Sequence, residues 1–137
     1  MKQTTKINVE NSSELIPKLL TDMVGVDDRL HRLANRIDWQ FLEQSLASRF
    51  NPDIDPSPRL IIGLLYLQAL ENLSYDEVRA RWASSPAWQY FCGETLYCRE
   101  YPLHPAALSI WSREIGAAGC KLMRHALTLQ PIREVVH

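Results

Sequence analysis

Residues 58–71 are apolar on nearly every face of the helix that they are expected to form. Ser57 followed by Pro58 is a typical helix start, because a serine hydroxyl caps free amides and proline suits the first helical position. Aliphatic side chains fill most of the following positions: Leu60, Ile61, Ile62, Leu64, Leu65, Leu67 and Leu70. A helix that is apolar all round must be covered on every side, so the sequence predicts a helical bundle with this segment at its centre.

A second helix is expected after a turn at residues 72–74. Ser74 and Glu77 stand at capping-box spacing, in which each side chain bonds the backbone amide of the other residue. The pattern predicts a helix over residues 75–83 that buries Val78 and Trp82. Two helices joined by a short turn form the skeleton of a helix-turn-helix, although such pairs also occur throughout all-α proteins.

Helical spacing extends over most of the remaining chain. Apolar residues at intervals of three and four predict further helices: residues 27–37, 38–50, 86–92, 105–115 and 121–129. The N-terminal arm is expected to hold at most one short helix, at residues 15–24. Gly93 is expected to end one helix, Gly116 and Gly119 to form a turn, and Pro131 to end the last helix. The expected fold is an all-α, compact bundle of six or seven helices that contains the helix-turn-helix-like pair. Its expected parts are a polar arm (1–26), one domain (27–130) and a tail (131–137).

The charge balance and the apolar stretches limit the function classes. The chain has 15 Lys+Arg against 16 Asp+Glu, whereas most nucleic-acid-binding domains carry a basic excess. Composition therefore argues mildly against DNA binding. No apolar stretch is long enough to span a bilayer, and the polar N-terminus lacks a cleavable apolar segment, so the cytoplasm is the expected compartment.

The aromatic residues and the cysteines are expected to be structural. The aromatic residues stand at helical spacing beside aliphatic ones, which favours core packing over base stacking: Trp82, Trp88, Tyr90, Phe91 and Trp111. The spacings of Cys92, Cys98, His104 and Cys120 match no common zinc finger. We therefore expect no metal and no cofactor.

Residues 58–94 closely resemble the N-terminal domain of InsH-type transposases, which are DDE-class enzymes encoded by bacterial insertion sequences. The shared features are a Pro-Arg-Leu start, a Gly-Leu-Leu-Tyr-Leu core helix and a Leu-Ser turn. The most specific motif is Trp-Gln-Tyr-Phe-Cys-Gly at residues 88–93. Segments at residues 30–39 and 102–119 are also similar, so the likeness covers roughly residues 29 to 120.

The resemblance implies a DNA-binding and multimerising region that recognises the terminal inverted repeats of the element and associates with the nucleoid. In such transposases, a catalytic domain follows in which three carboxylates hold two metal ions. No such carboxylates can be assigned in this chain, because Asp53, Asp55, Asp76 and Glu77 are expected in a loop or at a helix start. We therefore expect a chain truncated before the catalytic domain, with no enzymatic activity and no small-molecule substrate of its own.

The candidate DNA contacts are polar side chains expected on outer helix faces: Arg59, Arg79, Arg81, Ser109 and Arg113. Arg79 and Arg81 lead, on the second helix of the predicted pair. The alternative for Arg81 is a surface ion pair with Glu77, four residues earlier. Lys121 and Arg124 are interpreted as belonging to a solvated face.

One helix departs from the family pattern. Where the family tends to have basic residues, this chain has Ile110, Ser112 and Glu114, which reduces the expected affinity for phosphates. The outward Ile110 favours a second hypothesis, a decayed fragment or a protein–protein module that pairs with a second copy or with a full-length transposase.

Overall fold

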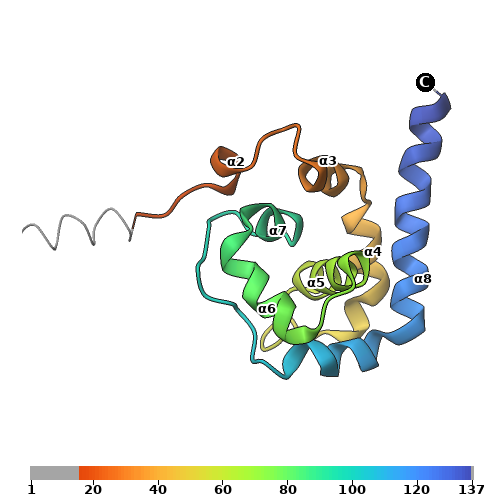
Figure 1. Ribbon diagram of the computed structural model, residues 1–137. Coiled ribbons are helices and arrows are strands. Elements are labelled where there is room, and N and C mark those ends of the chain that lie inside the picture. Colours follow the sequence, from red (N-terminus) through yellow and green to blue (C-terminus); the bar gives the residue numbers. More distant parts are fainter. Residues whose placement is uncertain (1–15, 137) are drawn as a thin grey trace, which may run out of the picture.

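The chain folds as an all-α bundle, as the sequence predicts (Figure 1). The computed structural model describes residues 16–136, with side chains as far as residue 126. Within these bounds lie seven α-helices: α2 (Leu20–Met23), α3 (Arg29–Arg36), α4 (Trp39–Leu46), α5 (Pro58–Glu71), α6 (Tyr75–Ser84), α7 (Pro86–Phe91) and α8 (Ala107–Val136). An isolated antiparallel bridge joins Leu19 to Leu96. The first 15 residues of the expected arm lie outside the described range.

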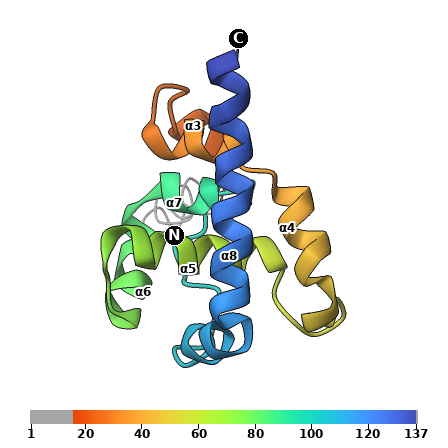
Figure 2. The same ribbon diagram turned by 90° about the vertical axis from the view of Figure 1, so that its right-hand side faces the viewer.

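Helix α5 forms the centre of the bundle and contacts α4, α6, α7 and α8 (Figures 1 and 2). Ile61, Leu64 and Leu67 are fully buried, which confirms the prediction from its apolar pattern. The Ser57 hydroxyl accepts a hydrogen bond from the Leu60 amide at 3.2 Å, and the helix ends at the left-handed Asn72. The apolar sequence of α5 therefore organises the other helices around it.

Helix α6 begins with the predicted capping box. The Ser74 amide donates to Glu77 Oε1 at 2.9 Å, and the Glu77 amide donates to Ser74 Oγ at 3.1 Å. The hydrogen bond from the Ser74 amide lowers the pKa of the Glu77 carboxyl, because it favours the ionised form. Val78 and Trp82 are buried against the bundle, so the helical pair of α5 and α6 forms as expected.

The motif at residues 88–93 belongs to the core. Trp88, Phe91 and Cys92 are buried, and burial raises the pKa of the Cys92 thiol. A methyl group added at Gly63 of α5 would come within 2.9 Å of Cys92 Sγ, so a glycine lets the two segments approach closely. Gly93 has a φ of 91° and ends α7, as predicted.

The motif also contains a buried glutamine. The Gln89 amide nitrogen donates to the carbonyls of Trp82 and Cys98, at 3.0 and 2.8 Å, and its oxygen accepts from the Cys98 amide at 2.8 Å. Gln89 therefore ties α6 and the loop after α7 to one point in the core. Sequence reasoning treated this residue only as part of a motif.

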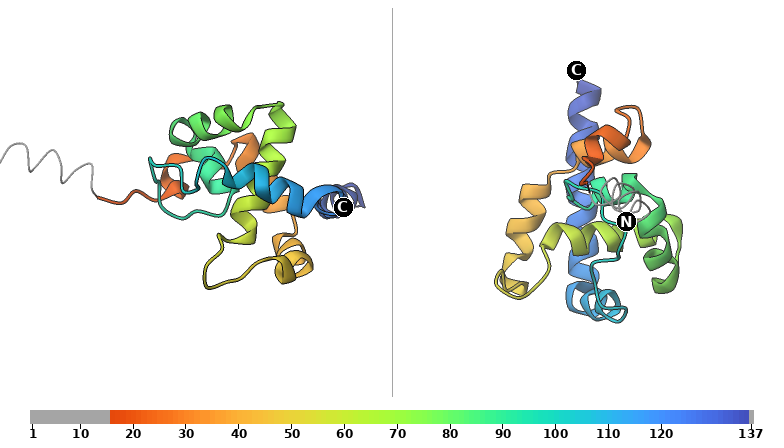
Figure 3. Two further views of the ribbon diagram at one scale, coloured as in Figure 1. Left: turned by 90° about the horizontal axis from the view of Figure 1, so that it is seen from below. Right: turned by 90° about the vertical axis from the view of Figure 1, so that its left-hand side faces the viewer.

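Two helical segments follow residue 105, as the sequence predicts, and together they make up α8 (Ala107–Val136). They meet at a kink at Gly116, where the backbone is non-helical with a φ of 51° and a ψ of −146°, and the expected turn as far as Gly119 does not form (Figures 1 and 3). Arg49 binds the Glu114 carbonyl at 2.9 Å, beside this bend. The expected stop at Pro131 is wrong, because α8 continues to Val136; the φ of proline is compatible with a helix, although its ring crowds the preceding turn and a hydrogen bond is lost.

Candidate nucleic-acid interface

The two leading candidate arginines lie on α6, and each has an acidic partner. Arg79 lies 3.6 Å from Asp76, and Arg81 Nη1 lies 2.7 Å from Glu71 Oε1. Glu77 was the expected partner of Arg81, but the capping box holds that carboxylate at the helix start. Arg81 instead links α6 to the end of α5, and its guanidinium also lies 5.4 Å from the ring of Trp88. This helix surface therefore carries paired charges of both signs.

Arg59 is half-buried at the start of α5. Its Nε donates to the Phe91 carbonyl at 3.2 Å, and its Nη2 donates to the Tyr90 carbonyl at 3.5 Å. The guanidinium carbon lies 4.3 Å from the centroid of the Trp39 ring. Burial lowers the pKa of Arg59 below its usual value. The side chain thus caps the carboxyl end of α7 and binds an aromatic face.

Ser109 and Arg113 lie on one face of α8, four residues apart. The Ser109 hydroxyl donates to the Ala106 carbonyl at 3.0 Å. Arg113 is exposed and makes no ion pair or hydrogen bond with any residue in the described part of the chain. The structure thus places the five candidate side chains on three different helices, α5, α6 and α8. Their contact with DNA stays a prediction.

Helix α3 carries a basic stripe that sequence reasoning missed. Arg29, Arg32 and Arg36 stand at i, i+3 and i+7, which places them on one helix face. No acidic residue lies within this helix. Its N-cap, Asp28, accepts hydrogen bonds from the amides of Leu30 and His31. Arg29 and Arg32 are exposed, and neither makes an ion pair within residues 16–126.

The second part of α8 adds to this positive charge. Lys121 and Arg124 are exposed, and the sequence from residue 115 to residue 126 contains no acidic side chain. Helices α3 and α8 are in contact, and both views show α3 beside the second part of α8 (Figures 1 and 2). We call the following five side chains the α3–α8 basic surface: Arg29, Arg32, Arg36, Lys121 and Arg124.

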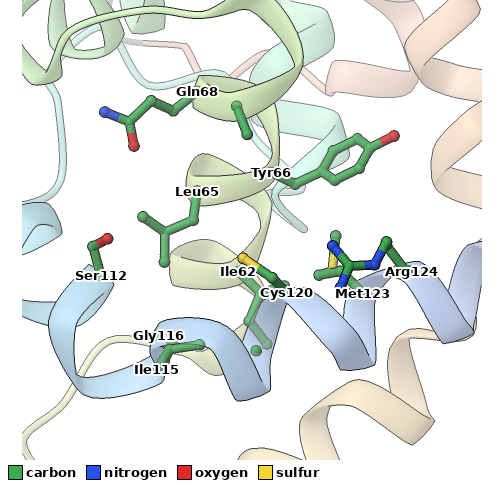
Figure 4. Close-up of a pocket in the computed structure, with 12 residues that line it drawn as sticks. Ile62, Leu65, Tyr66, Gln68, Ser112, Ile115, Gly116, Cys120, Met123 and Arg124 are labelled. Atoms are coloured by element: carbon green, nitrogen blue, oxygen red, sulfur yellow. The ribbon is translucent and has the colours of Figure 1, made fainter.

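Tyr66 of α5 lies between the two helices of this surface. It lines a groove together with Arg124 (Figure 4). Burial raises the pKa of Tyr66, and the positive charge of Arg29 acts in the opposite direction. Arg29 therefore acts on Tyr66, and Arg124 lines the same groove as Tyr66, so one side chain of α3 and one of α8 lie near the same residue of α5.

The groove itself is apolar and lies between α5 and α8, with a volume of about 360 Å³ (Figure 4). Ile62 and Leu65 line one wall, and Ile115 and Met123 line the other. Gly116, at the bend of α8, also borders it. Such a surface suits an apolar partner rather than a phosphate backbone.

Together, these features define an all-α module that combines a basic surface with an apolar groove. Residues 18–114 match the family model described as a transposase domain (DUF772), and the chain belongs to this family. It is also 31% identical, over 109 residues, to uncharacterized protein ORF8 in the nfe locus of Rhizobium meliloti. That match covers 78% of this chain and 53% of the relative, so the chain spans about half of the relative's length.

No solved structure matches the chain. In the described part of the chain, no helix is both long enough and apolar enough to cross a membrane. The family membership supports the resemblance to transposases, while the narrower likeness to InsH-type enzymes stays a prediction.

Proposed function

We propose that this chain is the DNA-binding region of an insertion-sequence transposase of the InsH type, and that it holds the ends of its element across the α3–α8 basic surface. The observation that carries the proposal is the stripe of Arg29, Arg32 and Arg36 along a helix without acidic residues. Guanidinium groups bind phosphate oxygens through several donors at once, and a row of them follows a phosphate backbone. Membership of a transposase-domain family supports this use of the surface.

The near-neutral composition does not oppose the proposal, because charge is distributed unevenly. Asp53 and Asp55 lie in the loop before α5, and Asp76 and Glu77 lie at the start of α6. Asp27 and Asp28 precede α3 and Asp38 follows it, but no acidic residue lies within α3 or among residues 115–126 of α8. DNA responds to the local potential of the face that it meets, so a basic face can bind despite a net charge of −1.

The proposed role is to bind the element ends and not to cut them. Strand cleavage by such enzymes needs carboxylates that converge on metal ions. Among the residues that the structure describes, no group of three or more His, Cys, Asp or Glu side chains lies close enough to hold a metal ion. The region is therefore proposed to position DNA for chemistry that takes place elsewhere in a transposase.

The test is a titration of fluorescently labelled duplexes, followed by anisotropy at several salt concentrations. One duplex carries the terminal inverted repeat that flanks the gene, and the other carries the same bases in shuffled order. We expect binding that weakens steeply with salt, because each phosphate contact releases counterions, and tighter binding to the repeat. Absent or salt-independent binding to both duplexes would contradict the proposal.

Self-association is a second candidate function, and the apolar groove between α5 and α8 favours it (Figure 4). The proposed occupant is a second copy of this chain, which also exposes Leu70 and Ile110. Ala69 is exposed and borders the groove, so Ala69→Glu places a charge there without disturbing the core.

Light scattering of the wild-type chain is expected to give twice the monomer mass, and Ala69→Glu is expected to give the monomer mass. The matched control is Ala80→Glu, which introduces the same charge at an exposed site on α6. A monomeric wild-type chain at high concentration would exclude self-association through this groove, and so would an Ala69→Glu variant that still dimerises.

A further inference from the structure

A polar pocket lies beside α3, where that helix meets the ends of α5 and α7. Its volume is about 410 Å³, which falls within the range of small-molecule sites. The side chains that carry its chemistry come from four segments: Asn35, Trp39, Arg59, Tyr90, Glu94 and Thr95. Because Asn35 precedes Arg36 on α3, the pocket adjoins the helix that bears the basic stripe.

Two flat groups that line this pocket are held in fixed positions. The Trp39 indole donates from Nε1 to the Ala34 carbonyl at 2.8 Å, and the Arg59 guanidinium lies over its ring. Arg59 is held in turn by the carbonyls of Tyr90 and Phe91. Trp39 is buried beneath Arg59, so this pair presents the guanidinium group to the pocket, and unpaired bases stack on guanidinium planes.

A third flat group belongs to Tyr90. Its ring is stacked on that of His31, with centroids 4.6 Å apart and planes within 4° of each other. Its hydroxyl donates to Asn35 Oδ1 at 3.2 Å. These contacts connect the pocket wall directly to α3, since His31 and Asn35 both belong to that helix.

Glu94 supplies an acceptor in this pocket. Its carboxyl is half-buried, and burial raises its pKa. Over residues 16–126, no side chain donates a hydrogen bond to this carboxyl. A half-buried carboxylate is more stable when a ligand donates to it, and the exocyclic amino groups of adenine, cytosine and guanine are such donors. Thymine lacks that group.

We infer that this pocket takes one unpaired, amino-bearing base of the bound DNA, whose backbone lies along the basic stripe of α3. The inference rests on the proposed function. Stacking on the Arg59 guanidinium, beside the Tyr90 ring, holds the base, and the Glu94 carboxylate accepts from its amino group. The Arg59 guanidinium provides a positive charge near the phosphate of the same nucleotide.

The experiment compares three short duplexes of one sequence by anisotropy titration. The first is fully paired, the second has one extra unpaired adenine, and the third has one extra unpaired thymine. We expect the unpaired adenine to strengthen binding to the wild-type chain by roughly tenfold over the paired duplex, and thymine to add much less. The thymine duplex controls for the bend that any extra base introduces.

The variants Glu94→Ala and Asn35→Ala are expected to reduce the adenine preference to about twofold or less while still binding the paired duplex. Arg79→Ala, on α6, is the control and should keep the preference. Thermal melting shows that each variant is folded before it is compared. Equal binding of the three duplexes by the wild-type chain would overturn the inference, and so would a preference that survives in both pocket variants. A wild-type chain that binds none of the three duplexes would instead overturn the proposed function.

Discussion

The double variant Arg29→Ala/Arg32→Ala is expected to bind duplex DNA roughly tenfold to a hundredfold more weakly than the wild-type chain at moderate salt. Both side chains are exposed on α3, and neither is used by an ion pair within the described residues. Each phosphate contact that is lost should make the plot of log K against log salt less steep by about one unit. Anisotropy titrations at several salt concentrations measure both quantities.

The matched control is Arg79→Ala, which removes one exposed arginine from α6. Arg79 lies 3.6 Å from Asp76, so its charge is already partly compensated. We expect this variant to change affinity by less than about threefold, because a paired surface charge adds little to the local potential. If Arg79→Ala weakened binding more than the α3 variant, the DNA would lie on α6, as the sequence suggested.

Gln89→Met is expected to destabilise the fold by about 2 to 3 kcal/mol, because it removes three hydrogen bonds to the backbone and leaves the Cys98 amide without its acceptor. Methionine has a similar volume, so the packing around residue 89 is largely kept. The Cys98 amide loses the acceptor that Gln89 Oε1 provides, and the Trp82 carbonyl loses a donor. The Cys98 carbonyl keeps a bond from the Trp82 indole, which limits the loss.

Urea unfolding followed by circular dichroism measures this effect. Gln44→Met is the matched control, since Gln44 is exposed on α4 and the same substitution there should change stability by less than about 0.5 kcal/mol. Equal midpoints for the two variants would show that the Gln89 hydrogen bonds do not stabilise the loop after α7.

The helical pair of α5 and α6 could be predicted from local signals alone. Proline at the first position, a serine cap and a capping box act within a few residues of each helix start, so the chain itself encodes these boundaries. The all-round apolar pattern of α5 also identified the central helix correctly. Burial of Trp82, Trp88 and Phe91 confirms the expectation that these aromatic residues belong to the core.

Long-range contacts could not be predicted in the same way. Arg81 pairs with Glu71 rather than with Glu77 because the turn brings the end of α5 beside α6. The break at Gly116 was predicted, but the direction in which the second segment of α8 leaves it depends on packing against α4 and α5, which the local sequence does not encode. The capping role of Arg59 depends on α7, which follows it by more than 25 residues.

The basic stripe of α3 corresponds to a recognisable sequence pattern. Residues 29–36 contain arginines at helical spacing and no acid, but the segment was interpreted through its apolar residues and its family resemblance. The helix-turn-helix-like pair instead placed the leading candidate DNA contacts on α6. The polar pocket could not be found from the sequence, because Asn35, Arg59 and Glu94 come together only in the folded chain.

Amide chemical-shift mapping tests most directly whether DNA binds across α3. The uniformly nitrogen-15-labelled chain is titrated with the inverted-repeat duplex, and the shift of each backbone amide is followed. We expect the largest changes at residues 29–36 and 121–124, with small changes at residues 75–84. Changes confined to residues 75–84, or no changes on addition of the duplex, would contradict the account.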